Sequence, residues 1–274
     1  MKIFFYANGS KAEALDAAKS LAAQARRLRL VVVEKGNEAD VVVVLGGDGT
    51  MLRAVHEFPG VALLGLNLGG LGYLAKVERK DFAAALEALA KGKYSISSRT
   101  MIAARKKGRD YLALNDVAVS SERSGHAAVM DVECDGRAVT RYMADGLVIA
   151  TPTGSTAYSL AAGGPVLMPD ASVLVLTPLN PHALGSRPVV LKDTVTLAVT
   201  ARSRVEREKE RLAVYSDGVK SFELASDETA EIRRSTVTAR LVELEGCDPY
   251  ETLAKKLGWA GSSVGDRQLR ENLV

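Results

Sequence analysis

A short glycine-rich turn carries a single carboxylate, in the sequence Gly46-Gly47-Asp48-Gly49-Thr50. It directly follows the aliphatic run 41–45 and precedes residues 51–57, which we predict to be helical. Glycines allow a ligand to approach the backbone closely, and the free N–H groups at the start of a helix suit phosphate. A cradle for phosphate alone needs no negative charge, so Asp48 predicts a general base or a residue that steers Mg²⁺. We therefore predict a catalytic Asp48 and a phosphate-donor site formed by Gly46, Gly47, Gly49 and Thr50.

The same turn has a plainer interpretation, in which Asp48 caps a helix after a tight turn. Two familiar nucleotide motifs do not describe it, because it lacks the Walker lysine and is not Gly-x-Gly-x-x-Gly. This argues against a P-loop NTPase and against a dinucleotide-binding dehydrogenase.

A second polar segment lies about a hundred residues later, at 145–158. A short apolar strand runs there into a turn that contains Pro, Gly and four hydroxyl side chains, and a predicted short helix, 159–162, follows. Hydroxyls and free N–H groups at a helix start can bind the ribose and phosphates of a nucleotide. A Ser/Thr-rich loop with a helix cap would have the same composition.

These strings resemble known signatures. The Gly-Gly-Asp-Gly turn is similar to one shared by NAD kinases, diacylglycerol and sphingosine kinases, and 6-phosphofructokinases, in which the Asp serves the attacking hydroxyl. The segment 145–158 resembles a signature of the NAD kinases that the other kinases lack. Further similar stretches follow in the family's order, and the similarity extends to the tail near 257–259. They are the loop 66–74, Asn115-Asp116, residues 177–188 and Asp217-Gly218.

The resemblance implies phosphorylation of the adenosine 2′-hydroxyl of NAD, giving NADP, with Asp48 serving that hydroxyl. Asn115 and Asp116 would hold polar edges of the adenine or ribose, and Asp145 would contact the nicotinamide side. Asp116 stands where Glu is more usual, and Tyr73 where Phe is more usual. The implied NAD-binding residues are Asn67, Tyr73, Asn115, Asp116, Asp145, Thr153, Thr156, Ala157 and Tyr158.

The resemblance also implies ATP or polyphosphate as phosphoryl donor, Mg²⁺ accompanying ATP, and a homo-oligomer, either a dimer or a tetramer. Two other functions stay open at this point. One is a lipid or sugar kinase of the same superfamily, against which 145–158 argues. The other is a nucleotide-binding sensor without turnover, which the intact Asp48 disfavours.

The elements that must position these residues change in type along the chain. Through about residue 95, strands alternate with helices, which predicts an α/β domain with a parallel, Rossmann-like sheet. From Tyr111 onward period-2 alternation dominates, and Asp135-Gly136 between two alternating runs predicts a hairpin. We predict a mainly antiparallel β domain at 98–249 and an α/β domain at 1–97, with the tail from about 250 to 274 packing back on it. We expect the active site to lie between these domains.

Composition agrees with a reduced, cytoplasmic enzyme. The chain has 274 residues and a net charge of +3, too small to argue for a nucleic-acid partner. Cys134 and Cys247 are far apart, and no His/Cys cluster predicts a metal site. No stretch approaches the ~18 apolar residues of a membrane span, and the N-terminal apolar run is too short for a signal peptide.

Overall fold

The computed structural model describes residues 1–7, 9, 12–69, 72–122, 126–203, 211–246 and 248–259. The chain divides into two compact units, one formed by Met1–Ser97 with Arg240–Val274 and the other by Ser98–Ala239. Three features considered in the sequence lie outside the described residues: most of the charged run 202–211, Cys247 and the last fifteen residues.

The first unit is an α/β sheet with helices on both faces. Its strands pair in parallel in the order β17-β4-β3-β1-β2, and β5 pairs with the end of β4. This confirms the predicted parallel sheet. Its elements are β1 (Lys2–Ala7), α1 (Ala12–Arg27), β2 (Val31–Val32), β3 (Val41–Leu45), α2 (Asp48–Glu57), β4 (Ala62–Asn67), β5 (Val77–Glu78), α3 (Phe82–Ala90) and α5 (Pro249–Leu257), with the end of β17 (Thr229–Leu244).

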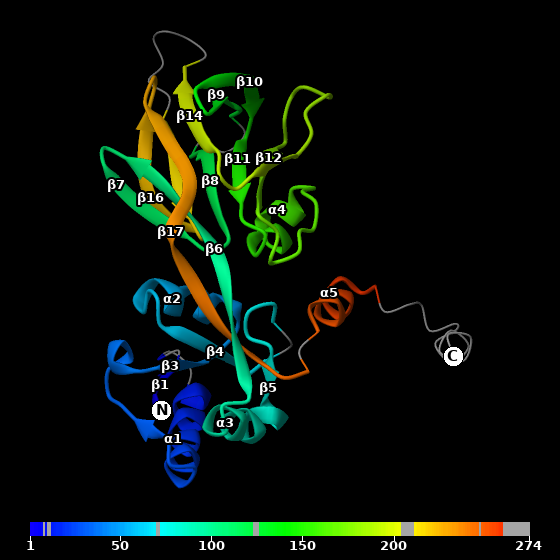
Figure 1. Cartoon of the computed structure of the whole chain (residues 1–274). Coiled ribbons are helices and arrows are strands. Elements are labelled where there is room, and N and C mark those ends of the chain that lie inside the picture. The colour runs from blue at the N-terminus through cyan, green and yellow to red at the C-terminus, as the bar shows by residue number, and fades with distance from the viewer. Residues whose placement is uncertain are drawn as a thin grey trace, which may run out of the picture. The chain divides into compact units, whose positions relative to one another are not determined.

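The two central strands are aliphatic on both faces because helices cover both. Every residue of β3 and β4 is buried, as a parallel sheet between helices requires. Val41, Val43 and Leu45 face the core that α1 and α3 complete. In Figure 1, α2 lies on the opposite side of this sheet from α1 and α3. The glycine-rich turn therefore leaves the carboxyl end of a rigid central strand.

Helix α2 begins earlier than predicted. Apolar spacing predicted its start at Met51, whereas the helix begins at Asp48, with Gly47 as an extended N-cap. The first turn of a helix carries no periodic apolar residue when it faces a ligand or a loop, so periodicity finds only the later turns. Asp48 therefore lies in the first helical turn, where backbone N–H groups lack intrahelical partners.

The second unit consists of two layers of antiparallel strands. One sheet has the order β13-β12-β11-β8-β15-β16, and the other contains β10-β9-β14-β17 together with β6 and β7. Its strands are β6 (Tyr94–Lys106), β7 (Arg109–Ala113), β8 (Asp116–Ser121), β9 (Ala128–Cys134), β10 (Arg137–Ala144), β11 (Gly146–Ala150), β12 (Val173–Leu179), β13 (Val189–Lys192), β14 (Thr196–Arg202), β15 (Arg211–Ser216) and β16 (Val219–Ala225), with β17 and the short helix α4 (Tyr158–Ala161).

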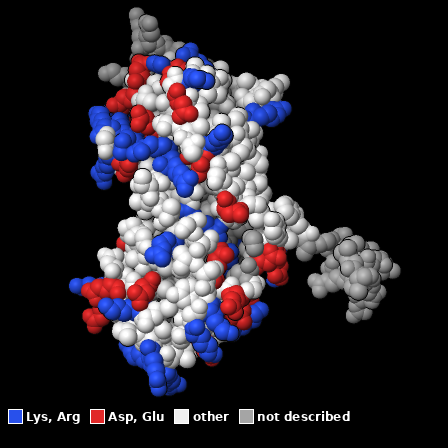
Figure 2. Space-filling model, viewed as in Figure 1, with Lys and Arg blue, Asp and Glu red and all other residues white. Residues whose placement is uncertain are grey.

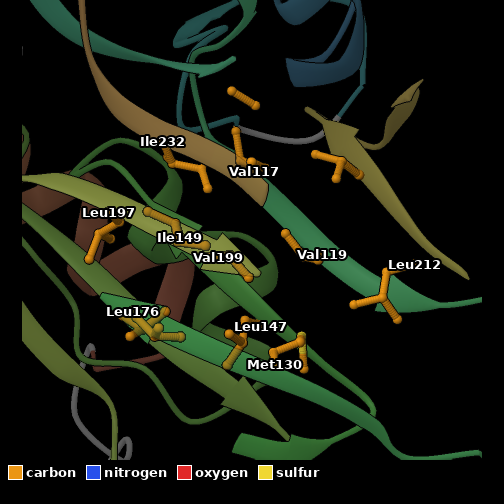
Figure 3. Close-up of a cluster of buried hydrophobic side chains, with 14 of the residues drawn as sticks. Val117, Val119, Met130, Leu147, Ile149, Leu176, Leu197, Val199, Leu212 and Ile232 are labelled. Atoms are coloured by element: carbon orange, nitrogen blue, oxygen red, sulfur yellow. The ribbon is translucent and has the colours of Figure 1, made fainter. Parts of the chain in front are cut away.

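The core of the second unit lies between its two layers. Figure 3 shows Ile149 and Leu176 from one sheet beside Leu197 and Ile232 from the other. Alternate residues of each strand point into this core, which explains the period-2 pattern in the sequence. The layer holding β8 and β11 carries the second set of predicted site residues, so packing fixes their backbone.

The hairpin predicted at Asp135-Gly136 is confirmed. Both residues have positive φ, 50° and 74°, and Cys134 pairs with Arg137. Elsewhere the prediction was coarser than the structure. The predicted run 187–201 is two strands, because a turn at the buried Asp193 separates β13 from β14. Strands β6 and β16 were not predicted.

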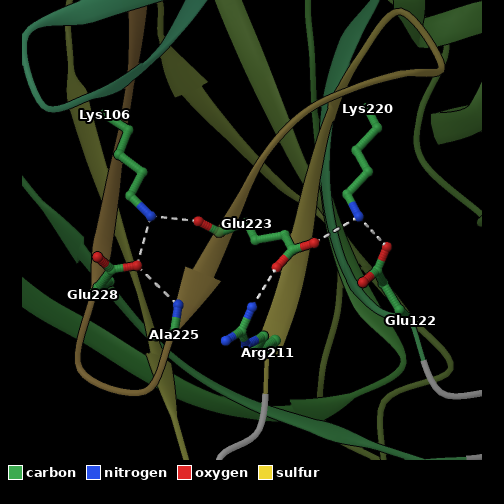
Figure 4. Close-up of polar contacts among 7 residues, drawn as sticks. All are labelled: Lys106, Glu122, Arg211, Lys220, Glu223, Ala225 and Glu228. Carbon is green, nitrogen blue, oxygen red and sulfur yellow. Dashed lines mark hydrogen bonds and ion pairs between the residues drawn. The ribbon is translucent and has the colours of Figure 1, made fainter.

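Charged residues of both signs occur on the face shown in Figure 2. A surface network on the second unit links Lys220 with Glu122 and Glu223, and Lys106 with Glu228 (Figure 4). Exposed ion pairs of this kind contribute roughly 0–1 kcal/mol each to stability, so they add little to the stability of this sheet edge. No helix among the described residues is long and apolar enough to cross a membrane.

Candidate functional site

The Asp48 carboxylate binds the backbone of a neighbouring loop. Oδ1 accepts hydrogen bonds from the N–H groups of Leu74 and Ala75, at 2.9 and 3.0 Å, and Oδ2 accepts one from Tyr73 at 2.9 Å. A Cβ on Gly72 would overlap Oδ1 and lie 2.9 Å from the Ala75 carbonyl oxygen. A glycine at position 72 therefore lets the loop close over the carboxylate.

These bonds leave the carboxylate able to accept one more. An ionised carboxylate offers about four acceptor positions, and the loop occupies three of them. The remaining position, on Oδ2, suits a single hydroxyl donor. Asp48 can thus orient a substrate hydroxyl and accept its proton while the loop holds the side chain in place.

The three glycines of the turn have different reasons to be glycine. A Cβ on Gly46 would overlap the Thr50 hydroxyl, so packing requires a glycine there. Nothing lies within 4 Å of a Cβ placed on Gly47 or Gly49, and neither residue has a positive φ. Within the described residues, the protein itself gives no reason for these two glycines. Space is left above the start of α2, where N–H groups and the helix dipole attract anions.

Thr50 and Asn67 make hydrogen bonds that hold the backbone around the glycine-rich turn. Thr50 is buried, and its N–H donates to the Gly47 carbonyl oxygen. Asn67 ends β4, is also buried, and closes the following loop: its Nδ2 donates to the Ala75 carbonyl oxygen and its Oδ1 accepts from Gly69 N–H. The Asn67 side chain and the Thr50 N–H thus hold the backbone of the site, while the ligand contacts predicted for both residues stay predictions.

Tyr73 completes the predicted set in the first unit. Its ring is partly exposed, and Lys256 Nζ of α5 lies 5.4 Å from the ring centroid. The first unit thus brings the glycine turn, Asn67 and Tyr73 together at the carboxyl ends of β3 and β4. Ligands of open α/β sheets bind at this edge. Gly70 and Leu71 of the same loop lie outside the described residues.

In the second unit, Asn115 and Asp116 lie at the start of β8, beside the end of β11. Asp116 pairs with Ala150, and Thr151 binds the same segment twice: its N–H donates to the Asn115 carbonyl oxygen at 2.9 Å and its hydroxyl to the Leu114 carbonyl oxygen at 2.6 Å. A Cβ on Gly154 would overlap the backbone carbonyl of Asn115. The two sequence-distant motifs therefore form one tightly packed site.

The structure separates the hydroxyls of the segment 151–158 into two groups. Ser155 is buried, accepts from Leu167 N–H and donates to the Pro152 carbonyl oxygen, so it shapes the turn. Thr153, Thr156 and Tyr158 keep exposed surface, as does Ala157 beside them, although the Thr153 hydroxyl oxygen itself is buried. The second group forms the accessible wall of the predicted nucleotide site.

Asp145 is not brought to this wall. It precedes β11, opposite the end where Thr151 follows, and its carboxylate accepts from Asn180 Nδ2 at 2.9 Å. At about 3.4 Å per strand residue, the intervening strand separates Asp145 from Thr151 by roughly 20 Å. Its implied contact with the nicotinamide side stays a prediction that this unit alone does not support.

Burial and a neighbouring charge act on Asp116. Its side chain is buried, and desolvation together with the negative charge of Asp217 raises its pKa to about 7.

Among the described residues, no group of three or more His, Cys, Asp or Glu side chains could hold a metal ion.

The raised pKa of Asp116 predicts a pH effect on stability. Between about pH 4 and pH 7 the folded state keeps a proton on Asp116 that the unfolded state has lost, so stability falls as the pH rises through this window. Asp116→Asn removes this effect, and its thermal stability relative to the wild type should increase from pH 5 to pH 8.

Asp131 provides the matched control. Hydrogen bonds from Arg141 and Arg202 lower its pKa to about 2, so its contribution to stability is lost only as the pH falls below about 4. Asp131→Asn should therefore be less stable than the wild type by the same margin at pH 5 and pH 8. A constant difference between Asp116→Asn and the wild type over that range would contradict the prediction.

Comparison with known families agrees with this geometry. Residues 2–94 match the model of the ATP-NAD kinase N-terminal domain, and residues 114–244 match that of the ATP-NAD kinase C-terminal domain. The chain is 37% identical over 234 residues to the NAD kinase of Christiangramia forsetii, covering 82% of this chain and 78% of that protein. It is 40% identical over 228 residues to the NAD kinase of Symbiobacterium thermophilum, covering 80% and 79%.

Solved structures share the fold. An NAD kinase from Archaeoglobus fulgidus, solved in complex with ATP, superposes with a TM-score of 0.79 at 25% identity and covers 95% of this chain and 100% of that one. Yeast NADH kinase, solved with NADH, gives a TM-score of 0.82 at 21% identity, covering 96% and 88%. The family models span both units and the curated relatives most of the chain, so the resemblance seen in the sequence is confirmed: the chain belongs to the NAD kinase family.

Proposed function

We propose that this NAD kinase transfers a phosphoryl group from ATP to the adenosine 2′-hydroxyl of NAD, with Asp48 as the group that receives the hydroxyl proton. The observation that carries the proposal is local. A carboxylate with one acceptor position left lies beside two glycines whose Cβ positions face open space, at the start of a helix. The free acceptor position can bind the substrate hydroxyl, and the helix start beside the two glycines can bind the phosphate.

The donor phosphates would bind over Gly47 and Gly49. The N-cap and first turn of α2 supply N–H groups and the positive end of the helix dipole. The Archaeoglobus fulgidus kinase was solved with ATP, which supports ATP as the donor here. Inorganic polyphosphate would use the same anion site, so a panel of donors distinguishes the two.

NAD would bind the second unit along Asn115, Asp116 and the segment 153–158. The Thr153 hydroxyl is buried without a hydrogen-bond partner among the described residues, and a polar atom of a ligand would satisfy it once the site adjusts.

The phosphoryl transfer then needs little covalent chemistry from the protein. The hydroxyl oxygen attacks the terminal phosphorus, its proton passes to Asp48, and ADP leaves.

Mg²⁺ would be held mainly by the donor's phosphates. The described residues contain no cage of three acidic or His/Cys side chains, and Mg²⁺ in kinases is commonly bound by one or two carboxylates and the substrate phosphates. When bound, the ion would neutralise charge on the phosphates. The family assignment further supports a homo-oligomer, a dimer or a tetramer, in the cytoplasm, and light scattering would measure its mass.

The function is tested by incubating the protein with ATP and NAD and measuring NADP. We expect NADP with NAD as acceptor and no phosphorylation of diacylglycerol or sphingosine. Calorimetric binding of NAD without NADP from any donor would instead support a nucleotide sensor. Phosphorylation of a lipid alone would support the related lipid-kinase activity.

Gly49→Ala should separate ligand binding from folding. Alanine fits the local backbone and is favoured in a helix by up to about 1 kcal/mol, so the thermal stability should be unchanged or slightly raised. The added methyl group fills the space assigned to the donor, so KM for ATP should rise about tenfold or more while KM for NAD changes little. Steady-state kinetics with each substrate varied measures both constants.

Two glycine variants serve as controls for Gly49→Ala. Gly185→Ala also places its Cβ in open space, at a residue of the second unit outside the set of predicted site residues, and should change neither stability nor KM. Gly46→Ala overlaps the Thr50 hydroxyl and should lower stability. An unchanged KM for ATP in Gly49→Ala would place the donor elsewhere.

A further inference from the structure

The turn between β15 and β16 holds the start of β8. Asp217 and Gly218 form this turn with positive φ angles of 49° and 77°. The Asp217 carboxylate accepts hydrogen bonds from the N–H groups of Leu114 at 2.8 Å, Asn115 at 2.7 Å and Asp116 at 3.3 Å. In return, Asp217 N–H donates to the Asp116 carbonyl oxygen at 3.0 Å. One turn residue thus makes four hydrogen bonds to three consecutive residues.

The segment that Asp217 holds is fixed from its other side as well. Thr151 binds the carbonyl oxygens of Leu114 and Asn115, and Gly154 packs directly against the Asn115 backbone. The carbonyl side of the segment is thus held by the 151–154 turn and the amide side by Asp217. Removing the Asp217 contacts frees only one side, which leaves the packed side intact.

We propose that Asp217 is a positioning residue for NAD: by binding the amides of 114–116, its carboxylate sets where the Asn115 and Asp116 side chains meet the nucleotide. The proposal rests on the proposed function, because it assumes that these two side chains contact NAD. Asp217 itself touches neither the substrate nor the reacting atoms in this assignment. Its effect should therefore appear in NAD binding more than in turnover.

The same carboxylate also acts on Asp116 through its charge. After burial, the charge of Asp217 is the second cause of the raised pKa of Asp116. On the elements that pair with β8, residues 146–157 contain no ionisable side chain, and Tyr215 of β15 pairs with Ala118, two residues beyond Asp116. Removing the Asp217 charge should consequently lower the pKa of Asp116, which a purely structural role would not require.

Asp135 supplies a matched control within the same unit. It occupies the corresponding place in the Asp135-Gly136 turn, with φ angles of 50° and 74°, and its carboxylate accepts a hydrogen bond from Thr196 N–H at 2.8 Å. Both aspartates therefore adopt the left-handed conformation and bind backbone amides. Only Asp217 binds the segment 114–116.

The experiment compares Asp217→Asn and Asp135→Asn with the wild type. Asn is tolerated in the left-handed region, so either turn should form. In Asp217→Asn one carboxylate oxygen becomes an NH₂ group that faces a backbone N–H. We expect KM for NAD to rise about 10- to 100-fold, the range that corresponds to one lost hydrogen bond to a charged group. KM for ATP should change less than about twofold, and Asp135→Asn should match the wild type in both constants.

The pH dependence of NAD binding gives a second readout. The pH midpoint of NAD affinity, measured by calorimetry, should be lower in Asp217→Asn than in the wild type and unchanged in Asp135→Asn. Equal effects of the two variants, or an equal rise in KM for both substrates, would overturn the positioning role. If Asp217→Asn does not fold, hydrogen exchange in the wild type decides: slow exchange of the three amides supports the role, and fast exchange contradicts it.

The failure of this proposal can be distinguished from failure of the proposed function. If the wild type forms no NADP from ATP and NAD, the proposed function is wrong whatever the variants do. If the wild type forms NADP and Asp217→Asn binds NAD with wild-type affinity and pH midpoint, only the role of Asp217 is wrong.

Discussion

Asp48→Asn should lower the turnover number of NADP formation by about 10²- to 10⁴-fold, the usual contribution of a general base. The amide keeps the shape of the side chain but cannot accept the hydroxyl proton. NAD binding should remain largely intact, because most of the predicted contacts come from the second unit. Steady-state rates with ATP and NAD, together with calorimetry with NAD alone, measure the two effects separately.

The same variant should also lose stability, which the contacts of the carboxylate explain. An Asn oxygen can still accept from Leu74 and Ala75, but its NH₂ group would then face the Tyr73 N–H. A donor that loses its acceptor in this way costs about 1–3 kcal/mol. Denaturant unfolding should show this loss, and the loop 72–75 should be the first segment to exchange its amides faster.

Asp40→Asn is the control for the loss of a carboxylate in the same unit. Asp40 Oδ2 accepts a hydrogen bond from the backbone N–H of Lys2 at 2.7 Å, on an exposed part of the surface. Its replacement should leave turnover unchanged. Full activity of Asp48→Asn would remove Asp48 from the reaction, and wild-type stability would contradict the role of its carboxylate in holding the loop.

Gly154→Ala should damage both the fold of the second unit and NAD binding. Its Cβ would overlap the carbonyl carbon and oxygen of Asn115, and these are backbone atoms that cannot rotate away. Overpacking a rigid site typically costs about 1–3 kcal/mol, occasionally more. Relief requires the Asn115 segment or the 151–154 turn to move, so the affinity for NAD should fall at least about tenfold.

Calorimetry with NAD and denaturant unfolding test the Gly154→Ala prediction. Gly185→Ala, in the same unit and with its Cβ in open space, controls for the loss of a glycine as such. If Gly154→Ala binds NAD as the wild type does, the contact between the two motifs does not shape the nucleotide site.

Local sequence patterns predicted the secondary-structure elements, whereas contacts between residues far apart in the sequence form the site. The aliphatic run 41–45 and the Asp135-Gly136 turn predicted a buried parallel strand and a hairpin, because each depends on a few adjacent residues. The three amides bound by Asp48 lie 25 to 27 residues away, and those bound by Asp217 lie more than 100 residues away. No local pattern indicates which distant backbone a carboxylate will meet.

The roles of individual side chains within the motifs were equally hard to read. The segment 151–158 predicted several hydroxyls near a ligand, but Ser155 is used to shape the turn. Asp145 belongs to the same continuous string, yet the length of β11 separates it from the rest. A motif shows that residues serve one function without showing which of them lie together. The turn signal Asp-Gly was present at Asp217, but only the fold reveals what its carboxylate binds.

The pairing of β17 with β4 has a consequence for the order of events during synthesis. Arg240 and Leu241 pair in parallel with Ala62 and Leu63, so one edge of the first unit's sheet is supplied by residues near the end of the chain. At about 5–20 residues per second, a ribosome adds these residues roughly 10–35 s after it has completed β4. The second unit, which is contiguous in sequence, is fully synthesised before then. We therefore expect the nascent chain to complete its β sandwich first, and to keep the start of β4, at Ala62 and Leu63, as an unprotected sheet edge, available to chaperones or to aggregation, until the last strand emerges.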